Sequence, residues 1–299
     1  MRVLLLGPNG QVGWELRRAL APLATVVAAD RGSQVDLPGD LENIDSLRET
    51  VRRCRPDVIV NAAAYTAVDT AEKEPERVRL INALAPGALA EEASFLGALL
   101  VHYSTDYVFD GAGDKPWREE DAVAPLNVYG HSKLEGEELI RRSGCRHLIL
   151  RTCWVYATRG KNFLRNMLRL AQEREHLSVV DDQIGSPTGA DLVADVTAHV
   201  IPAMQERAIV SGTWHLSAGG NTSWHGYALY AIEAARSMGL PIRVSAEAIA
   251  PCRTADFPTP ARRPQNSRLC TRKLREDFGL ELADWKEGLN RTLVEICKP

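Results

Sequence analysis

The stretch that decides the fold is RVLLLGPNGQVGWELRRALA, residues 2–21. Its apolar start is typical of a buried strand, and its second half has the spacing of an amphipathic helix. Between them, GPNGQVG places glycines at positions 7, 10 and 13. In a dinucleotide-binding loop the first glycine makes a tight turn, the second lets the backbone approach a pyrophosphate, and the third lets the helix pack on the strand. The alternative is a tight turn without a ligand. The cofactor-binding residues predicted here are Gly7, Asn9, Gly10, Gln11 and Val12.

An acidic residue about 20 positions after such a loop usually binds the adenosine ribose. Asp30, at the end of the second apolar run, has that place and favours NADH, because a carboxylate repels a 2′-phosphate. Arg31 follows at once and could instead hold that phosphate, so the sequence leaves NADH and NADPH open. Asp40 and Leu41 stand where an adenine could rest, although Asp40 is equally well explained as an ordinary turn residue.

The same alternation of apolar and amphipathic segments continues to about residue 156. Strands that are apolar throughout, with helices between them, predict a parallel sheet covered on both faces. The fold class is therefore α/β, a Rossmann-like doubly wound parallel sheet with a smaller α/β substrate-binding domain. We expect residues 1–153, with part of 189–215, to form the dinucleotide-binding domain. Residues 154–188 and 216–299 are expected to form mainly the substrate-binding domain, with the chain crossing between the two.

Small residues follow the third predicted strand. NAAAYTAVD, residues 61–69, places Ala62, Ala63 and Ala64 where a cofactor could lie close to the backbone, next to Tyr65. Close helix packing explains alanines equally well. We assign these four residues to the cofactor site as a prediction.

Tyr129 and Lys133 lie four residues apart in NVYGHSKLEGE, residues 127–137. In a helix this spacing puts both side chains on one face. A solvated helix that carries both residue types by chance is one explanation. The other is a general acid with a cation beside it that tunes its pKa.

Bulk properties exclude several classes of protein. The 299 residues carry a net charge of -3 and are 45% hydrophobic, so no basic surface for nucleic acid is indicated. No stretch has the length of a membrane span, and the apolar run at Val3–Leu6 is too short for a signal peptide. The six cysteines form no C-x-x-C pair. Scattered cysteines without a secretion signal fit the cytoplasm.

Several longer runs resemble one known family. They are GQVGWEL, RPDVIVNAAAYTAVDTAE, VHYSTDYVFDG, PLNVYGHSKLEGE, RTCWVY, DQIGSPTGADL and RPQNSRL. Together they resemble the dTDP-4-dehydrorhamnose reductase family of the extended short-chain dehydrogenase/reductase superfamily, over nearly the whole chain. The resemblance implies NAD(P)H-dependent reduction of the 4-keto group of dTDP-4-dehydro-β-L-rhamnose to dTDP-L-rhamnose, the last step of dTDP-rhamnose synthesis.

The resemblance also implies roles for the residues around Tyr129. Tyr129 would give a proton to the oxygen that develops at C4, and Thr105 would hydrogen-bond the keto oxygen. Lys133 would lower the pKa of Tyr129 and hold the nicotinamide ribose. Asp106 and Tyr107 would help to shape the sugar pocket.

Further substrate contacts are carried over from the family. Trp154 would lie against the sugar, although the residue alone is equally typical of a core. Asn162 is a predicted substrate residue that could simply cap the next helix. Arg263, with Arg262 and Arg268 in TPARRPQNSRL, would bind the substrate diphosphate, unless this loop is only a solvated basic segment.

Members of the family can dimerise around Mg²⁺ held by carboxylates. Glu15, Asp191 and Glu295 stand at the matching positions, and we predict a homodimer with Mg²⁺ at its interface. Asp191 departs from the glutamate expected there. Three unrelated surface acids are the alternative.

Two other functions compete with the reductase. One is another nucleotide-sugar enzyme, an epimerase or dehydratase that recycles its bound NAD. The other is a non-catalytic regulatory subunit of the methionine adenosyltransferase type. The combination of Thr105, Tyr129 and Lys133 argues against a pure binding protein, which gains nothing from a tuned acid.

Overall fold

The computed structural model describes residues 1–32, 35–206 and 211–297. Its centre is a seven-stranded sheet in which every strand pair is parallel. Across the sheet the strands run β11 (Gly212–His215), β6 (Arg146–Thr152), β5 (Leu99–Thr105), β4 (Val58–Asn61), β1 (Arg2–Leu6), β2 (Thr25–Asp30) and β3 (Leu37–Pro38). The doubly wound parallel sheet predicted from the sequence is confirmed.

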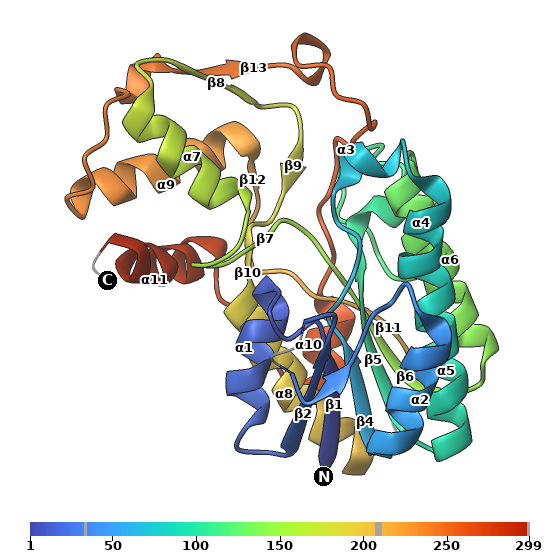
Figure 1. The fold of residues 1–299 in the computed structure, drawn as a ribbon. Helices are drawn as coiled ribbons and strands as arrows, with labels where there is room; N and C mark the ends of the chain where they lie inside the picture. The colour runs from blue at the N-terminus through green and yellow to red at the C-terminus, as the bar shows by residue number, and fades with distance from the viewer. Residues whose placement is uncertain (33–34, 207–210, 298–299) are drawn as a thin grey trace.

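Helices cover both faces of this sheet (Figure 1). One face carries α1 (Gln11–Leu20), α8 (Ala190–Glu206) and α10 (Arg272–Phe278), and the other carries α2 (Ile44–Cys54), α5 (Ala85–Leu96) and α6 (Val128–Arg142). Alternate strand residues face opposite ways. Val3 and Leu5 of β1 therefore pack with the first helix set, and Leu4 and Leu6 pack with the second.

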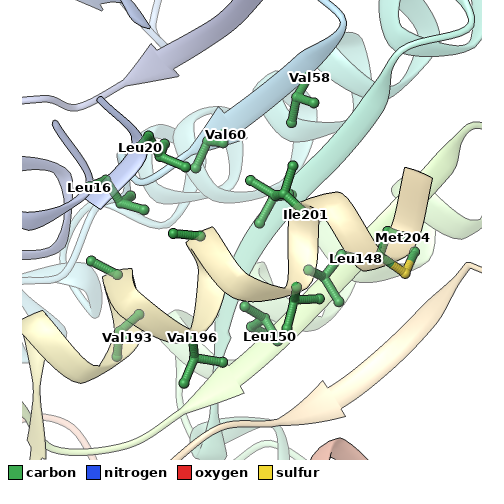
Figure 2. Packing of buried hydrophobic residues seen from close by; sticks show 14 of the residues in the cluster. Leu16, Leu20, Val58, Val60, Leu148, Leu150, Val193, Val196, Ile201 and Met204 are labelled. Carbon is green, nitrogen blue, oxygen red and sulfur yellow. The ribbon is translucent and has the colours of Figure 1, made fainter. Parts of the chain in front are cut away.

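Helix α8 forms much of the first of these cores. Figure 2 shows Val193, Val196 and Ile201 of α8 facing strand residues such as Val60 and Leu150. All five are buried. After the first excursion of the chain into the second lobe, α8 and β11 pack again with the sheet, while 207–210 lie outside the described residues. The expected division into two domains stays a prediction.

The helical segment that precedes β5 consists of three consecutive pieces. They are α4 (Pro75–Arg79), a π-helical turn at Leu80–Leu84, and α5. The π turn lies just before Pro86, whose missing N–H and ring are incompatible with an uninterrupted helix. It presents Asn82, whose amide bonds the backbone of Tyr65 and donates to Ser132 of α6 over 3.1 Å.

The second lobe lies beyond the carboxyl ends of the sheet strands (Figure 1). Its helices are α7 (Phe163–Glu173), α9 (Trp224–Ser237) and α11 (Trp285–Cys297). Short strand pairs support them: β7 (Val155–Tyr156) with β10 (Thr188–Gly189), β8 (Leu177–Val180) with β13 (Ile249–Cys252), and β9 (Ile184–Gly185) with β12 (Thr222–Ser223). Within the predicted 216–299, α10 packs on the sheet instead, and 298–299 lie outside the described residues.

No helix in the described ranges is long and apolar enough to cross a membrane.

Candidate active site

The residues at the carboxyl ends of four sheet strands meet at one edge of the sheet. Gly7 follows β1, Asp30 ends β2, Asn61 ends β4 and Thr105 ends β5. Parallel strands end at the same edge, and ligands of open α/β sheets bind outside these carboxyl ends. The candidate site therefore lies between this edge and the second lobe.

The glycine loop is packed too tightly for side chains at two of its three glycines. A Cβ on Gly13 would lie 1.9 Å from the carbonyl oxygen of Gly7, and one on Gly7 would lie 2.9 Å from the backbone nitrogen of Ala63. Gly7 also has φ +71°, which favours glycine. Gly10 caps α1 without a side-chain hydrogen bond, so the first N–H groups of the helix are open to an anion. This cradle fits a dinucleotide pyrophosphate.

Asp30 presents its carboxylate at the end of β2. It accepts hydrogen bonds from Asn9 Nδ2 over 2.9 Å and from the backbone nitrogen of Arg31 over 2.8 Å. The Arg31 side chain is 66% exposed and lies 3.7 Å from Glu42. A carboxylate suited to a ribose and a guanidinium suited to a phosphate thus stand side by side.

The side chains of Asp40 and Leu41 both make contacts within the protein. The Asp40 carboxylate accepts the backbone N–H of Glu42 over 3.0 Å, as a turn residue does. Leu41 is 5% exposed and belongs to the core beneath β2. Asp40 makes the contact of a turn residue and the Leu41 side chain is core, while their predicted contact with an adenine stays a prediction.

The alanines after β4 lie against the glycine loop. Ala63 contacts Gly7, which explains the need for small residues on both sides. Ala62 and Ala63 are half-buried and Ala64 is exposed. The Tyr65 hydroxyl donates to Glu74 over 3.1 Å, so its ring faces α4.

The start of α6 is fixed by three contacts. Asn127 accepts the N–H of Gly130 over 2.8 Å and so caps the helix. Its amide also donates to the carbonyl of Arg262 over 2.7 Å, and Glu72 accepts the N–H of Val128 over 2.9 Å. These contacts hold Tyr129, in the first turn, in a defined position beside the end of β5.

Tyr129 lies beside Thr105 and Asp106. Burial raises the pKa of Tyr129 to about 12, although the hydrogen bond with Thr105 lowers it, and Asp106 raises it further. In the chain alone, burial of the phenol is the largest effect on this pKa, and the lowering expected from Lys133 stays a prediction. Thr105 also caps the 3-10 turn Asp106–Val108 by accepting the N–H of Tyr107 over 3.2 Å.

The Lys133 side chain is buried within the protein. Its Nζ lies 3.0 Å from His102 Nε2 and donates to the carbonyl oxygen of Tyr103 over 2.6 Å. Burial lowers the pKa of Lys133 to about 8, and the charge of Glu137 opposes this shift. The sequence placed Lys133 correctly on the helix but did not reveal His102 as its partner.

Asp106 is a buried carboxyl group with one oxygen unpaired. It is 2% exposed, and Oδ2 has no hydrogen-bond partner in the described chain. Burial raises the pKa of Asp106 to about 7, against hydrogen bonds from Ser267 and Thr105. An unpaired buried acceptor of this kind costs free energy unless a ligand or water completes it.

Tyr107 and Arg263 border the site from the other side. The Tyr107 ring meets the Tyr129 ring edge to face, with centroids 5.7 Å apart. Arg263 donates to Asp69 over 2.7 Å, which fixes its guanidinium before any substrate arrives. Burial raises the pKa of Tyr107, so its hydroxyl stays protonated.

Trp154 has a backbone conformation that a bulky residue rarely adopts, φ +49°. Its ring stacks on Trp224 at a centroid distance of 3.6 Å, and a Cβ on Gly185 would lie 2.6 Å from it. Such strain, about 1–3 kcal/mol, persists only where surrounding packing imposes it. The sequence alone did not identify Trp224 and Gly185 as the partners of Trp154.

Asn162 caps α7, the alternative that the sequence left open. Its Oδ1 accepts the N–H of Arg165 over 3.0 Å, and its Nδ2 donates to Gln11 over 2.7 Å. The second bond joins the second lobe to the helix that follows the glycine loop. Its predicted contact with substrate stays a prediction.

The arginine-rich loop lies next to a cavity of ≈ 500 Å³. Its lining includes Arg262, Arg263, Gly111, Leu126 and Phe257. Arg268 instead donates to the carbonyl of Asp114 over 3.0 Å and to Asn266.

The three carboxylates predicted to hold Mg²⁺ do not form a metal site within one chain. Glu15 pairs with Arg18 over 3.2 Å, while Asp191 and Glu295 lie 3.6 and 3.9 Å from Arg291. No group of three potential metal ligands occurs among the described residues. Within one chain Arg291 supplies positive charge to two of these carboxylates, and the Mg²⁺ site expected between two chains stays a prediction.

Comparison with characterised proteins shows the family of this chain. The family described as RmlD substrate binding domain matches residues 1–297. dTDP-4-dehydrorhamnose reductase of Escherichia coli K12 is 53% identical over 296 residues, 99% of this chain and 98% of that protein. The enzyme of the same name from Burkholderia thailandensis is 47% identical over 99% of both chains.

Solved structures give the same result. The crystal structure of dTDP-4-dehydrorhamnose reductase from Bacillus anthracis in complex with NADP has a TM-score of 0.88 and 35% identity, covering 98% of this chain and 99% of that one. A dTDP-glucose 4,6-dehydratase from Streptomyces venezuelae, at 17% identity and a TM-score of 0.81 over 98% and 96%, shares the fold. This chain therefore belongs to the RmlD family of dTDP-4-dehydrorhamnose reductases.

Proposed function

We propose that this protein uses NADPH or NADH to reduce the 4-keto group of dTDP-4-dehydro-β-L-rhamnose, giving dTDP-L-rhamnose in the last step of dTDP-rhamnose synthesis. The observation that carries the proposal is the 53% identity with an enzyme of that name, along nearly the full chain. The meeting of Thr105 and Tyr129 beside a glycine loop supports it.

The cofactor would be held by the glycine loop and the alanines after β4. Gly7, Gly10 and the open first turn of α1 would take the pyrophosphate, and Asp30 or Arg31 would meet the adenosine ribose. Lys133 would hold the other ribose. A reduced nicotinamide bound there supplies the hydride.

Tyr129 would donate the proton to the C4 oxygen. Because burial keeps its pKa at about 12, the phenol is fully protonated near neutral pH. An alkoxide is a stronger base than a phenolate, so the transfer runs downhill once the C4 oxygen carries charge. Thr105 would donate a hydrogen bond to the same oxygen, which aligns it with the phenol.

The sugar would lie between the end of β5 and the second lobe. Trp154, held by its stack on Trp224, would present an apolar face to the ring. Tyr107 and the unpaired Oδ2 of Asp106 would face its hydroxyl groups. Arg263 would bind the diphosphate, because its guanidinium is already oriented by Asp69.

Consumption of the reduced cofactor tests the reaction. Purified protein with enzymatically generated dTDP-4-dehydro-L-rhamnose should remove one equivalent of NADPH or NADH for each sugar and form dTDP-L-rhamnose. An epimerase or dehydratase would recycle NAD without net loss, and a regulatory subunit would bind nucleotide without turnover. The epimerase and dehydratase neighbours, at 17–20% identity, share only the fold.

Homodimer formation, Mg²⁺ at the interface and a cytoplasmic location stay predictions. Within one chain the Mg²⁺ ligands are already paired with arginines, so a metal site would need a rearrangement of Arg291. Sedimentation with Mg²⁺ and with chelator tests the first two together. An oligomer that is the same in both conditions would refute the metal-dependent dimer.

A further inference from the structure

Three buried side chains form a hydrogen-bonded row behind the proposed proton donor. Asn61 Nδ2 lies 3.2 Å from His102 Nδ1, and His102 Nε2 lies 3.0 Å from Lys133 Nζ. The exposed fractions are 1%, 0% and 2%. The row joins the end of β4 and the middle of β5 to α6. Because the three side chains are buried, each of their hydrogen-bonding groups needs a partner within the protein.

The first bond of the row has a fixed direction. The backbone N–H of Ala63 donates to Asn61 Oδ1 over 3.2 Å, so this oxygen is the acceptor end of the amide. The amide nitrogen, which can only donate, therefore faces His102. His102 Nδ1 must accept and carries no proton.

The direction of the second bond follows from the first. Burial lowers the pKa of His102 well below its ordinary value, so the ring is neutral and its one proton is on Nε2. That N–H points at Lys133. A charged ammonium has only donors, whereas an uncharged amine can accept from Nε2–H and donate to the Tyr103 carbonyl, 2.6 Å away.

The other charged groups near Lys133 do not change the requirement that its amine accept a hydrogen bond from His102. Glu137, one turn further along α6, attracts a proton to Lys133 but is already bonded by Arg151 of β6 over 2.7 Å and by Arg141. Tyr129, one turn earlier on the same helix, is a neutral phenol. Burial itself opposes charge on Lys133.

We propose that Asn61 and His102 are positioning residues that disfavour the ammonium form of Lys133 in the free protein, through a row of hydrogen bonds with one direction. Charging Lys133 then requires the His102 proton to move to Nδ1 and the Asn61 amide to turn over. Turning the Asn61 amide over breaks its hydrogen bond with the Ala63 N–H. The hydrogen-bonding states of Asn61, His102 and Lys133 therefore change together. The inference rests on the proposed function only for the role of Lys133 beside Tyr129.

Two substitutions at Asn61 remove the side-chain amide N–H that sets the direction of the hydrogen-bonded row. Asn61→Asp keeps an acceptor for Ala63 and offers His102 Nδ1–H a carboxylate, and Asn61→Ala removes the donor without adding charge. Both free His102 Nε2 to accept from a lysine ammonium. Asn290→Asp, the same exchange on α11 at a site bonded to Tyr230, is the matched control.

The measurement is nitrogen NMR of the free protein, with thermal melting to verify folding. Above the pH at which Lys133 loses its proton, the His102 proton should be on Nε2 in the wild type and on Nδ1 in Asn61→Asp. The midpoint for protonation of Lys133, identified by the signal lost in Lys133→Met, should rise by about one pH unit in both Asn61 variants. Asn290→Asp should leave both signals unchanged.

A wild-type His102 proton on Nδ1 while Lys133 is uncharged, or Asn61 variants that both leave the Lys133 midpoint unchanged, would overturn the proposal. Since the experiment needs neither cofactor nor substrate, it is independent of the proposed reaction. If the reductase assay fails while the NMR result holds, the function is wrong and the hydrogen-bonded row stands.

Discussion

Gly13→Ala tests whether the glycine loop is shaped by close backbone packing. The added methyl carbon would lie 1.9 Å from the Gly7 oxygen, 2.8 Å from the Gly7 carbonyl carbon and 3.0 Å from Pro8 Cα. All three atoms are backbone, so no side chain can rotate away. Overpacking typically costs about 1–3 kcal/mol, and a clash with main chain belongs at the upper end. At about 3 kcal/mol the melting temperature should fall by roughly 5–10 °C.

Gly10→Ala is the matched control. A methyl group there would lie 3.4 Å from the Gly7 oxygen, which is close to ordinary contact. Its stability should change by about 1 kcal/mol or less, the usual cost of alanine at an N-cap. Its affinity for NADPH should nevertheless fall about tenfold or more, because the methyl group occupies the approach of the pyrophosphate.

The assay is thermal melting of both variants without cofactor, followed by a fluorescence titration with NADPH. The expected result is a large loss of stability only in Gly13→Ala, with weakened cofactor binding in both. Equal melting temperatures for the two variants would refute the packing argument. Unchanged affinity in Gly10→Ala would refute the placement of the pyrophosphate.

Four further variants test other parts of the protein. Tyr129→Phe should lower kcat by about 10²–10⁴-fold with NADPH binding retained, whereas Tyr107→Phe should lower it far less; steady-state kinetics and cofactor titration measure both. Glu137→Gln should cost about 3–5 kcal/mol in denaturant unfolding, because it leaves buried Arg151 unpaired. Although burial opposes ionisation, the bonds from Arg151 keep the pKa of Glu137 low, so its contribution to stability is full above about pH 4.5 and disappears as pH falls through the lowered pKa. Asp30→Asn should raise the ratio of kcat/KM for NADPH over NADH about tenfold, by removing repulsion of the 2′-phosphate; an unchanged ratio would exclude this role.

The sheet could be predicted from the sequence because its determinants are local. Apolar runs such as RVLLL and DVIVN have the composition of strands buried on both faces. The glycines at 7 and 13 are required by contacts a few residues away, so their spacing is visible in the sequence. Tyr129 and Lys133 could be placed on one helical face for the same reason.

Other features of the site depend on contacts between distant segments. Trp154 owes its conformation to Trp224 and Gly185, which come 70 and 31 residues later in the chain. His102 was hidden within an apolar strand, and only the parallel register of β4 and β5, which pairs it with Asn61, reveals its partner. The pKa of Tyr129 depends on burial, which its spacing from Lys133 does not report.

The most direct test of the central claim is the absorbance of NADPH and NADH in the presence of dTDP-4-dehydro-L-rhamnose, with wild type and Tyr129→Phe side by side. We predict stoichiometric loss of reduced cofactor and formation of dTDP-L-rhamnose with the wild type, and turnover reduced at least a hundredfold in the variant. A wild-type protein that binds the cofactor but consumes none, or a variant with near-normal turnover, would contradict the account.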